Sequence, residues 1–269
     1  MFEQKKMMIF DMDGTLIDSI GIWNQTDMEL SRRLSAAPQD IHTACDAGAA
    51  PESVDAEAAL LCGDPEEEIQ NRRDELLRRF STAASPYLEY CRVLGETYGS
   101  SLTPEEIHTL RYDIAQDFLR NEIDYKGGAD AFLRELKHRG FSLVIASTTR
   151  KKNMDIYRAE NRNLMEKAPI DRIFDAVYTR EDAREIKPHP EIYLRVLDDF
   201  HIPAEDCLVF EDSLIGIEAA KAAGLDTVAV YDRYSNADRA AIVRLADFQI
   251  ADYRDALQRL REECGHDKL

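Results

Sequence analysis

The chain has 269 residues, of which 44% are hydrophobic and 32% charged, a composition typical of a globular protein with a large core or a core and a smaller companion domain. Its formal net charge of −18 repels phosphate backbones and anionic lipid headgroups, so we do not expect nucleic acid or a membrane surface as a partner. Because the first residues hold too short an apolar run for a signal peptide, and no later stretch approaches the about 20 apolar residues of a membrane-spanning helix, we expect a cytoplasmic protein.

The first predicted element is a short apolar strand, Met7–Phe10, followed directly by the letters DMDGT. Open parallel sheets bind ligands at the carboxyl ends of their strands, where Asp11 and Asp13 would lie. Cleavage of a phosphate ester needs a nucleophile and an acid that protonates the leaving oxygen, and two aspartates can supply both. Gly14 would permit a tight turn. The alternatives are a plain acidic loop or a calcium loop of the EF-hand kind, but the latter needs Glu where this chain has Ile22.

Residues 17–124 contain no convincing strand and are predicted to form a mostly helical insertion. Its best helices are predicted at residues 64–80 and 103–120, the second with a Thr-Pro-Glu-Glu start that suits a helix N-terminus. Residues 36–59 have few large apolar side chains and are expected to be a mobile loop or short helices.

From residue 125 onward, short apolar runs alternate with amphipathic stretches, the pattern of βαβ units and a parallel sheet. The predicted strands are Ser142–Ala146, Ala176–Tyr178, 207–210, 227–230 and Phe248–Ile250. The predicted helices are Ala129–His138, 152–167, 190–200, 214–223 and Tyr253–Glu263. The chain is therefore expected to be an α/β protein. It should have a doubly wound, Rossmann-like core of residues 1–16 and 125–269, with residues 17–124 inserted as a helical cap domain.

Two polar features follow strands of this core. Ser147 and Thr148 come after Ser142–Ala146, where hydroxyl and backbone N–H groups can hold a phosphate, although capping a helix is the commoner role of such a serine. Lys187 precedes a predicted helix, where a lone lysine is usually a surface charge. A single ammonium is nevertheless what the added negative charge of an aspartyl phosphate requires.

Glu211, Asp212 and Ser213 directly follow the strand predicted at residues 207–210. Magnesium prefers oxygen ligands from one or two carboxylates, and acidic residues at a strand end suit it. An Asp or Ser that caps the next helix is an equally good interpretation of each residue alone.

In their order along the chain, these four motifs resemble those of the haloacid dehalogenase superfamily. They match as DMDGT, the serine after VIA, the lysine of KPHPEIY, and EDSLIGIEAAKAAG. The resemblance covers residues 7–16 and about 125–230. It is to the subgroup with a helical cap, which includes phosphoglycolate phosphatase-like enzymes and β-phosphoglucomutase. The cap, and the stretch between the second and third motifs, are longer than expected for this subgroup, so no cap residue is matched.

The resemblance implies roles for the motif residues. Asp11 would be the nucleophile, and Asp13 the acid/base that also binds the metal through its backbone carbonyl. The implied catalytic residues are Asp11, Asp13 and Lys187. The implied phosphate-binding residues are Ser147, Thr148 and Lys187. The implied magnesium ligands are Asp11, Asp13, Glu211 and Asp212.

The function expected on this basis is magnesium-dependent hydrolysis of a small phosphate monoester through an aspartyl phosphate on Asp11, with a small phosphorylated metabolite as partner and the oligomeric state left open. A sugar-phosphate mutase of the β-phosphoglucomutase kind is the first alternative. It would need a second cationic pocket, for which residues 148–152 are candidates. A catalytically silent phosphometabolite-binding protein is the second alternative, but such a protein has no need of both Asp11 and Asp13. The helical insertion is expected to act as a lid hinged near residues 16–19 and 124–128.

The five cysteines are scattered and form no Cys-x-x-Cys pair, so we expect reduced thiols. They are Cys45, Cys62, Cys91, Cys207 and Cys264.

Overall fold

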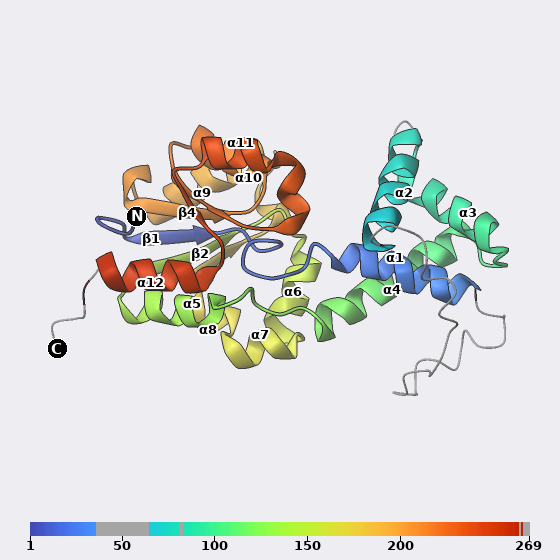
Figure 1. The fold of residues 1–269 in the computed structure, drawn as a ribbon, viewed down its shortest axis with the longest axis horizontal. Helices are drawn as coiled ribbons and strands as arrows, with labels where there is room; N and C mark the ends of the chain where they lie inside the picture. The colour runs from blue at the N-terminus through green and yellow to red at the C-terminus, as the bar shows by residue number, and fades with distance from the viewer. Residues whose placement is uncertain (36–64, 81–82, 264, 266–269) are drawn as a thin grey trace. The chain divides into compact units, whose positions relative to one another are not determined.

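The structure is a computed structural model that describes residues 1–35, 65–80, 83–263 and 265. The chain divides into two compact units (Figure 1). We call Met1–Ile20 with Leu119–Leu269 the sheet unit and Gly21–Phe118 the helical unit. Cys91 and Cys207 are buried free thiols. The predicted loop at residues 36–59 and the other three cysteines lie outside the described residues.

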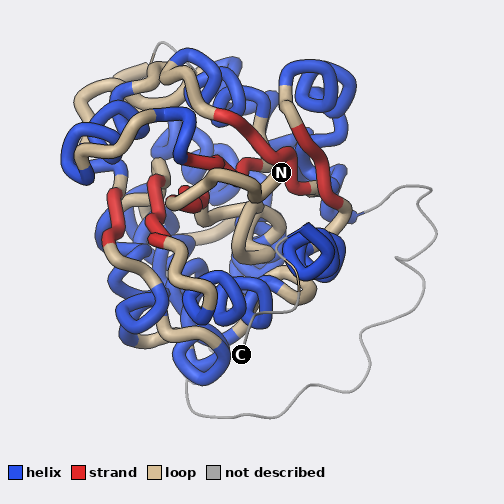
Figure 2. The backbone as a smooth tube through the Cα atoms, turned by 90° about the vertical axis from the view of Figure 1, so that its left-hand side faces the viewer, coloured by secondary structure: helices blue, strands red, loops and turns tan. Residues whose placement is uncertain are grey.

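A six-stranded parallel sheet forms the centre of the sheet unit, in the order β3-β2-β1-β4-β5-β6. The strands are β1 (Met7–Phe10), β2 (Ser142–Ala146), β3 (Ala176–Tyr178), β4 (Cys207–Glu211), β5 (Asp226–Val230) and β6 (Phe248–Ile250). Every predicted strand is present within one residue, and the predicted doubly wound α/β fold is confirmed. Helices lie on both sides of the strands (Figure 2).

The central strand β1 is buried on both faces, since its residues Met7 to Phe10 are at most 1% exposed. It pairs with β2 on one side and with β4 on the other, with Phe10 opposite Ile145 and Phe210. Strands that are covered on both faces read as continuous apolar runs, which is why MMIF carries no polar alternation. The strand order reverses at β1 and β4, and the crevice at such a reversal is where α/β sheets bind ligands.

The helices of the sheet unit cover both faces of the sheet, α5, α8 and α12 on one and α9, α10 and α11 on the other (Figure 1). They are α5 (Ala129–His138), α6 (Lys151–Ala159), α7 (Arg162–Lys167), α8 (Ile170–Ile173), α9 (Glu191–Phe200), α10 (Leu214–Ala222), α11 (Arg239–Leu245) and α12 (Tyr253–Glu263). Beneath α5 and α12, the rings of Phe10 and Phe210 stack with centroids 4.7 Å apart, with Phe132 and Tyr253 packed around them. This aromatic layer supports the two strands that end at the reversal point.

The helix predicted over residues 152–167 is wrong as a single element. The structure has α6 and α7 there, with a break at Glu160 and Asn161. The Asn161 side chain accepts a hydrogen bond from the Leu164 backbone N–H at 2.9 Å, while its amide nitrogen donates to the Leu119 carbonyl at 2.7 Å. A buried asparagine with these partners starts a new helix, although the apolar spacing runs through it.

The helical unit contains α1 (Ile22–Ser35), α2 (Pro65–Arg79), α3 (Pro86–Tyr98) and most of α4 (Pro104–Asn121). The start predicted for the last helix is present. Thr103 and Glu106 form a reciprocal pair of side-chain to backbone bonds, at 2.8 and 3.2 Å, with Pro104 in the first turn. Apolar side chains of α1, α3 and α4, among them Leu30 and Leu94, form a core of its own.

A buried ion cluster joins three helices of this unit. The Asp27 carboxylate of α1 is 1% exposed and accepts two hydrogen bonds from the Arg111 guanidinium, at 2.6 and 3.2 Å. Arg73 donates to the same carboxylate at 2.9 Å. The Arg111 guanidinium also lies 5.3 Å from the centre of the Trp23 ring.

The two segments that connect the units are paired with each other inside the sheet unit. Ile17 forms an antiparallel bridge with Tyr125. The Asp18 N–H donates to the Asp124 carbonyl at 3.1 Å, and the Lys126 N–H donates to the Leu16 carbonyl at 2.9 Å. We call residues 16–18 and 124–126 together the neck.

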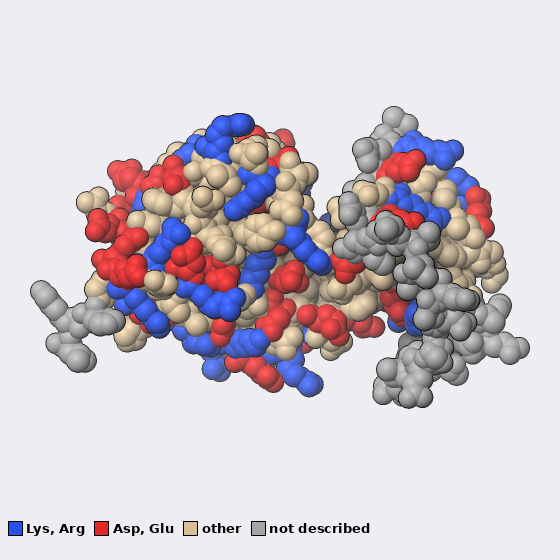
Figure 3. Space-filling model, viewed as in Figure 1, with Lys and Arg blue, Asp and Glu red and all other residues tan. Residues whose placement is uncertain are grey.

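No helix of the described residues is both long and apolar enough to cross a membrane. On the face drawn in Figure 3, basic and acidic side chains are interspersed over the sheet unit.

Candidate active site

The motif residues meet at the reversal point because the register of the sheet brings their strand ends together. The Asp11 N–H donates to the Phe210 carbonyl at 3.0 Å and so continues the pairing of β1 with β4. The Ser147 N–H donates to the Tyr178 carbonyl at 3.0 Å. Residues separated by more than a hundred positions thus lie at one edge of the sheet.

Lys187 is the cation at this edge, and its side chain is 3% exposed. Its ammonium donates to Asp11 Oδ1 at 2.7 Å, to Glu211 Oε1 at 2.6 Å and to the Ala146 carbonyl at 2.9 Å. Since an ammonium has three N–H donors, all are used and the group is held in one orientation. Burial opposes its charge, but Asp11 and Glu211 raise the pKa of Lys187 well above its ordinary value, so it stays charged.

Three buried carboxylates, from Asp11, Glu211 and Asp212, have ligand oxygens within 4.8 Å of one another. Burial raises the pKa of Asp11 to about 7, against the attraction of Lys187, and the charge of Glu211 adds to the shift. Burial, then Glu211 and Asp11, raises the pKa of Asp212 well above its ordinary value. One lysine therefore does not compensate this much negative charge. An all-oxygen donor set with excess negative charge fits a hard divalent cation.

Asp212 and Glu211 are held in place by close packing as well as by hydrogen bonds. Thr15 donates to Asp212 at 2.7 Å. Gly14 has φ +80°, and a Cβ there would lie 2.6 Å from an Asp212 carboxylate oxygen. A Cβ on Gly216 would lie 2.0 Å from the Glu211 carboxylate. Both glycines are therefore needed for these carboxylates to occupy their positions.

Asp13 lies beside this group, but its carboxylate is engaged by hydroxyl groups. Ser19 donates to Oδ1 at 2.6 Å, Tyr157 donates to the same oxygen at 2.8 Å, and Thr149 donates to Oδ2. Burial, and then the charge of Asp13, raises the pKa of Tyr157 well above its ordinary value, so the phenol stays protonated. Asp13 was predicted to bind the metal through its backbone carbonyl. The hydrogen bonds described here involve only its side chain.

The two phosphate-binding residues predicted from the second motif, Ser147 and Thr148, differ in burial. Ser147 is 1% exposed and its hydroxyl lies 3.0 Å from that of Thr149. Thr148 is exposed. The buried Thr149, which was not among the predicted site residues, connects Ser147 to Asp13.

Several contributors were not among the predicted site residues. Tyr193 on α9 is fully buried and its hydroxyl donates to Glu211 Oε1 at 3.0 Å. Tyr157 on α6 and Gly216 on α10 were also not predicted. The letters PEIY after Lys187 were the available signal for Tyr193, since a polar-tipped aromatic on an amphipathic helix needs a buried partner.

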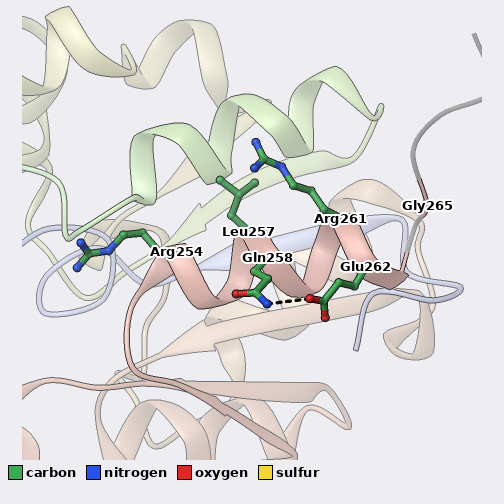
Figure 4. Close-up of a pocket in the computed structure, with 6 residues that line it drawn as sticks. All are labelled: Arg254, Leu257, Gln258, Arg261, Glu262 and Gly265. Atoms are coloured by element: carbon green, nitrogen blue, oxygen red, sulfur yellow. Dashed lines mark hydrogen bonds between the residues drawn. The ribbon is translucent and has the colours of Figure 1, made fainter.

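A cavity of about 720 Å³ lies elsewhere, along α12 (Figure 4). It is lined by Arg254, Leu257, Gln258, Arg261, Glu262 and Gly265. Within its lining, Gln258 pairs with Glu262 at 2.8 Å, and Arg254 pairs with the neighbouring Asp252 at 2.6 Å. None of its lining residues belongs to the four motifs, so we place the candidate active site at the strand ends.

Residues 5–224 match the family described as haloacid dehalogenase-like hydrolases. The chain belongs to this family. The resemblance inferred from the four motifs is thereby confirmed, and the matched range includes all of them.

Relatives of the chain include phosphatases. It is 33% identical over 127 residues to the protein CbbY of Rhodobacter capsulatus, an alignment that covers 47% of this chain and 51% of that protein. It is 27% identical over 164 residues to the phosphorylated carbohydrates phosphatase of Thermotoga maritima, covering 53% of this chain and 76% of that protein. The chain spans about half the length of the first curated relatives it matches.

Solved structures share the fold over nearly the whole chain. A putative β-phosphoglucomutase from Thermotoga maritima aligns with a TM-score of 0.66 at 22% identity, covering 96% of this chain and 99% of that one. A predicted phosphoglycolate phosphatase from Haemophilus somnus aligns with a TM-score of 0.60 at 18% identity, with the same coverage.

Proposed function

We propose that the chain hydrolyses small phosphate monoesters, with Asp11 as the nucleophile. The observation that supports this most strongly is the contact set of Asp11. Its carboxylate lies at the reversal point of the sheet, 2.7 Å from a buried ammonium and beside two further carboxylates. This arrangement combines a nucleophile, a fixed positive charge and a cation site within one group of side chains.

In the first step, an Asp11 oxygen attacks phosphorus as the bond to the leaving oxygen breaks, and Asp13 gives its proton to that oxygen. In the second step, water attacks phosphorus, Asp13 takes a proton from it, and the Asp11–phosphorus bond breaks to release phosphate. Ser147 holds the phosphoryl group, and the Lys187 ammonium, which donates to Asp11, supplies a fixed positive charge beside it.

Magnesium is the cation we propose for the carboxylate group of Asp11, Glu211 and Asp212, because it favours oxygen ligands from few carboxylates. When bound, it supplies positive charge against the phosphoryl oxygens and the three carboxylates. Release of phosphate is expected to stop on chelation and to return with magnesium, and zinc should substitute poorly. Full activity after exhaustive chelation would contradict the proposal.

Phosphorylated carbohydrates are the first substrate class to test, because one relative is named for them. A solved structure of CbbY from Rhodobacter sphaeroides, at 21% identity, is described in complex with xylulose-(1,5)bisphosphate. We propose a sugar phosphate as the substrate here, with the helical unit as the part of the chain that selects it.

A mutase would need a second cationic pocket, and the candidate run gives little support for one. The Lys151 ammonium pairs with Asp155 at 2.7 Å and its side chain is 65% exposed. The deciding experiment compares two measurements. One is phosphate release from sugar monophosphates. The other is conversion of β-glucose 1-phosphate to glucose 6-phosphate with a bisphosphate primer. Efficient conversion with negligible phosphate release would overturn hydrolysis as the function.

A further inference from the structure

The Asp13 carboxylate is held by more directional contacts than its neighbours in the motif. It accepts hydrogen bonds from Ser19 at 2.6 Å, from Tyr157 at 2.8 Å, and from Thr149. A carboxylate has about four acceptor positions, so three of them are occupied and one remains for a proton. These contacts define where that remaining position points.

Tyr157 is the contact whose geometry is set by packing. It lies on α6, 144 residues from Asp13 in sequence, and is 2% exposed. Its helix neighbours Met154 and Ile156 are buried as well, at 0% and 3%. A buried hydroxyl that loses a hydrogen-bond partner costs folding free energy, so the bond and the packing reinforce each other.

The same network reaches the phosphate-holding serine. The Thr149 N–H donates to Ser147 Oγ at 3.2 Å, and the two hydroxyl oxygens are 3.0 Å apart. Thr149 in turn donates to Asp13. The group that would hold the phosphoryl oxygens and the group that would move the proton therefore share one set of hydrogen bonds.

We propose that Tyr157 is a positioning residue for proton transfer: its hydroxyl fixes the Asp13 carboxyl so that the free acceptor position faces the leaving oxygen of the substrate. This inference rests on the proposed function. Tyr157 itself touches neither the substrate nor the phosphoryl group. It acts through Asp13, so its effect should depend on how much the leaving group needs a proton.

The test is Tyr157→Phe, which keeps the ring and removes the hydroxyl. The quantity to compare is kcat/KM for an alkyl phosphate and for 4-nitrophenyl phosphate, because kcat/KM covers only the steps up to release of the leaving group. We expect a loss of about tenfold for the alkyl ester, whose alkoxide must be protonated, and of less than about twofold for the activated ester.

Tyr178→Phe is the matched control, because the Tyr178 hydroxyl donates at the same 2.8 Å to Asp199, a carboxylate outside the four motifs, and the substitution keeps the Tyr178 backbone carbonyl that pairs with Ser147. It should change neither value. In an Asp13→Asn background, Tyr157→Phe should cost nothing further with phenyl phosphate. Equal losses on both esters, no loss, or a full additional loss in the Asp13→Asn background would overturn the inference alone. Absence of phosphate release by the unmodified chain would overturn the proposed function with it.

Discussion

Asp11 is a buried carboxylate. Its burial costs folding free energy that a structural role would not require. Its pKa is raised to about 7 by burial, and its partner Lys187 has no N–H donor left for other groups. The carboxylate is thus kept poorly solvated and oriented, as a nucleophile must be.

Asp11→Asn should reduce phosphate release by at least about a thousandfold, because the amide is similar in shape but cannot attack phosphorus. The metal-free protein should remain folded, since the change removes a buried charge. Steady-state kinetics and thermal unfolding check the two parts. Asp206→Asn, at a surface carboxylate paired with Lys6, is the control and should keep full activity. Wild-type turnover by the Asp11 variant would exclude the mechanism.

The raised pKa values also predict how stability depends on pH. Between an unfolded pKa near 3.8 and a folded pKa of about 7, folded Asp11 holds a proton that the unfolded chain has lost. Stability from this group is therefore lost as pH rises through that window, and Asp212 acts in the same direction. One pKa unit corresponds to about 1.4 kcal/mol, so the effect should reach a few kcal/mol.

Metal-free protein should accordingly unfold at lower temperature at pH 8 than at pH 5.5, and magnesium should restore more stability at the higher pH. Asp212→Asn should raise the metal-free unfolding temperature at pH 8 and reduce the gain from magnesium. Thermal scans with and without chelator measure both. An unfolding temperature that changes with neither pH nor magnesium would show that the three carboxylates do not act as described.

Among the helices, α1 and α4 are joined by charge as well as by apolar packing. Asp27 faces two guanidinium groups from Arg73 and Arg111, and its own burial leaves no water to replace them. Removal of one partner from such a buried pair is costly because the remaining charges stay uncompensated.

Asp27→Asn should destabilise the helical unit by about 3–5 kcal/mol, since the buried Arg111 guanidinium would lose its counter-charge. Trp23, the single tryptophan of the sequence, lies in this unit and contacts Arg111, so its fluorescence reports the unfolding directly. Glu96→Gln removes an exposed pair with Arg92 and should cost less than about 1 kcal/mol. Equal effects of the two changes would contradict the importance of burial.

The elements of the sheet unit were largely predictable because buried strands and amphipathic helices leave direct traces in local sequence. The strands were located to within one residue, and the strand-end positions of Asp11 and Glu211 followed from them. The helix break at Asn161 was not predictable, because it depends on carbonyls supplied by residues 119 and 123. The contacts of Thr149 and Tyr157 with Asp13 span 136 and 144 positions, and no local pattern encodes them.

The two units of the chain would also separate two tasks, with the chemistry in the sheet unit and substrate selection in the helical unit. The four motifs lie in the sheet unit, whereas residues 21–118 supply none of them. If the helical unit selects the substrate, its removal should spare the chemistry and abolish the selection.

Replacing residues 21–118 with a flexible Gly/Ser linker of about six residues should leave a folded sheet unit, because the neck already holds the two ends together. This variant should still release phosphate from 4-nitrophenyl phosphate but lose its preference among sugar phosphates. Circular dichroism and the substrate panel measure the outcome. Preserved discrimination between sugar phosphates would place specificity in the sheet unit.

The neck has a consequence for how such a chain can change over time. With Ile17 bridged to Tyr125, the two ends of the insertion are held together within the sheet unit. The entropic cost of closing a loop grows only with the logarithm of its length. The stability of the sheet unit should therefore change little when the inserted segment is lengthened, shortened or exchanged. The sheet unit should thus tolerate different inserted segments. Substrate specificity can then evolve in the insertion while the catalytic residues of the sheet unit stay the same.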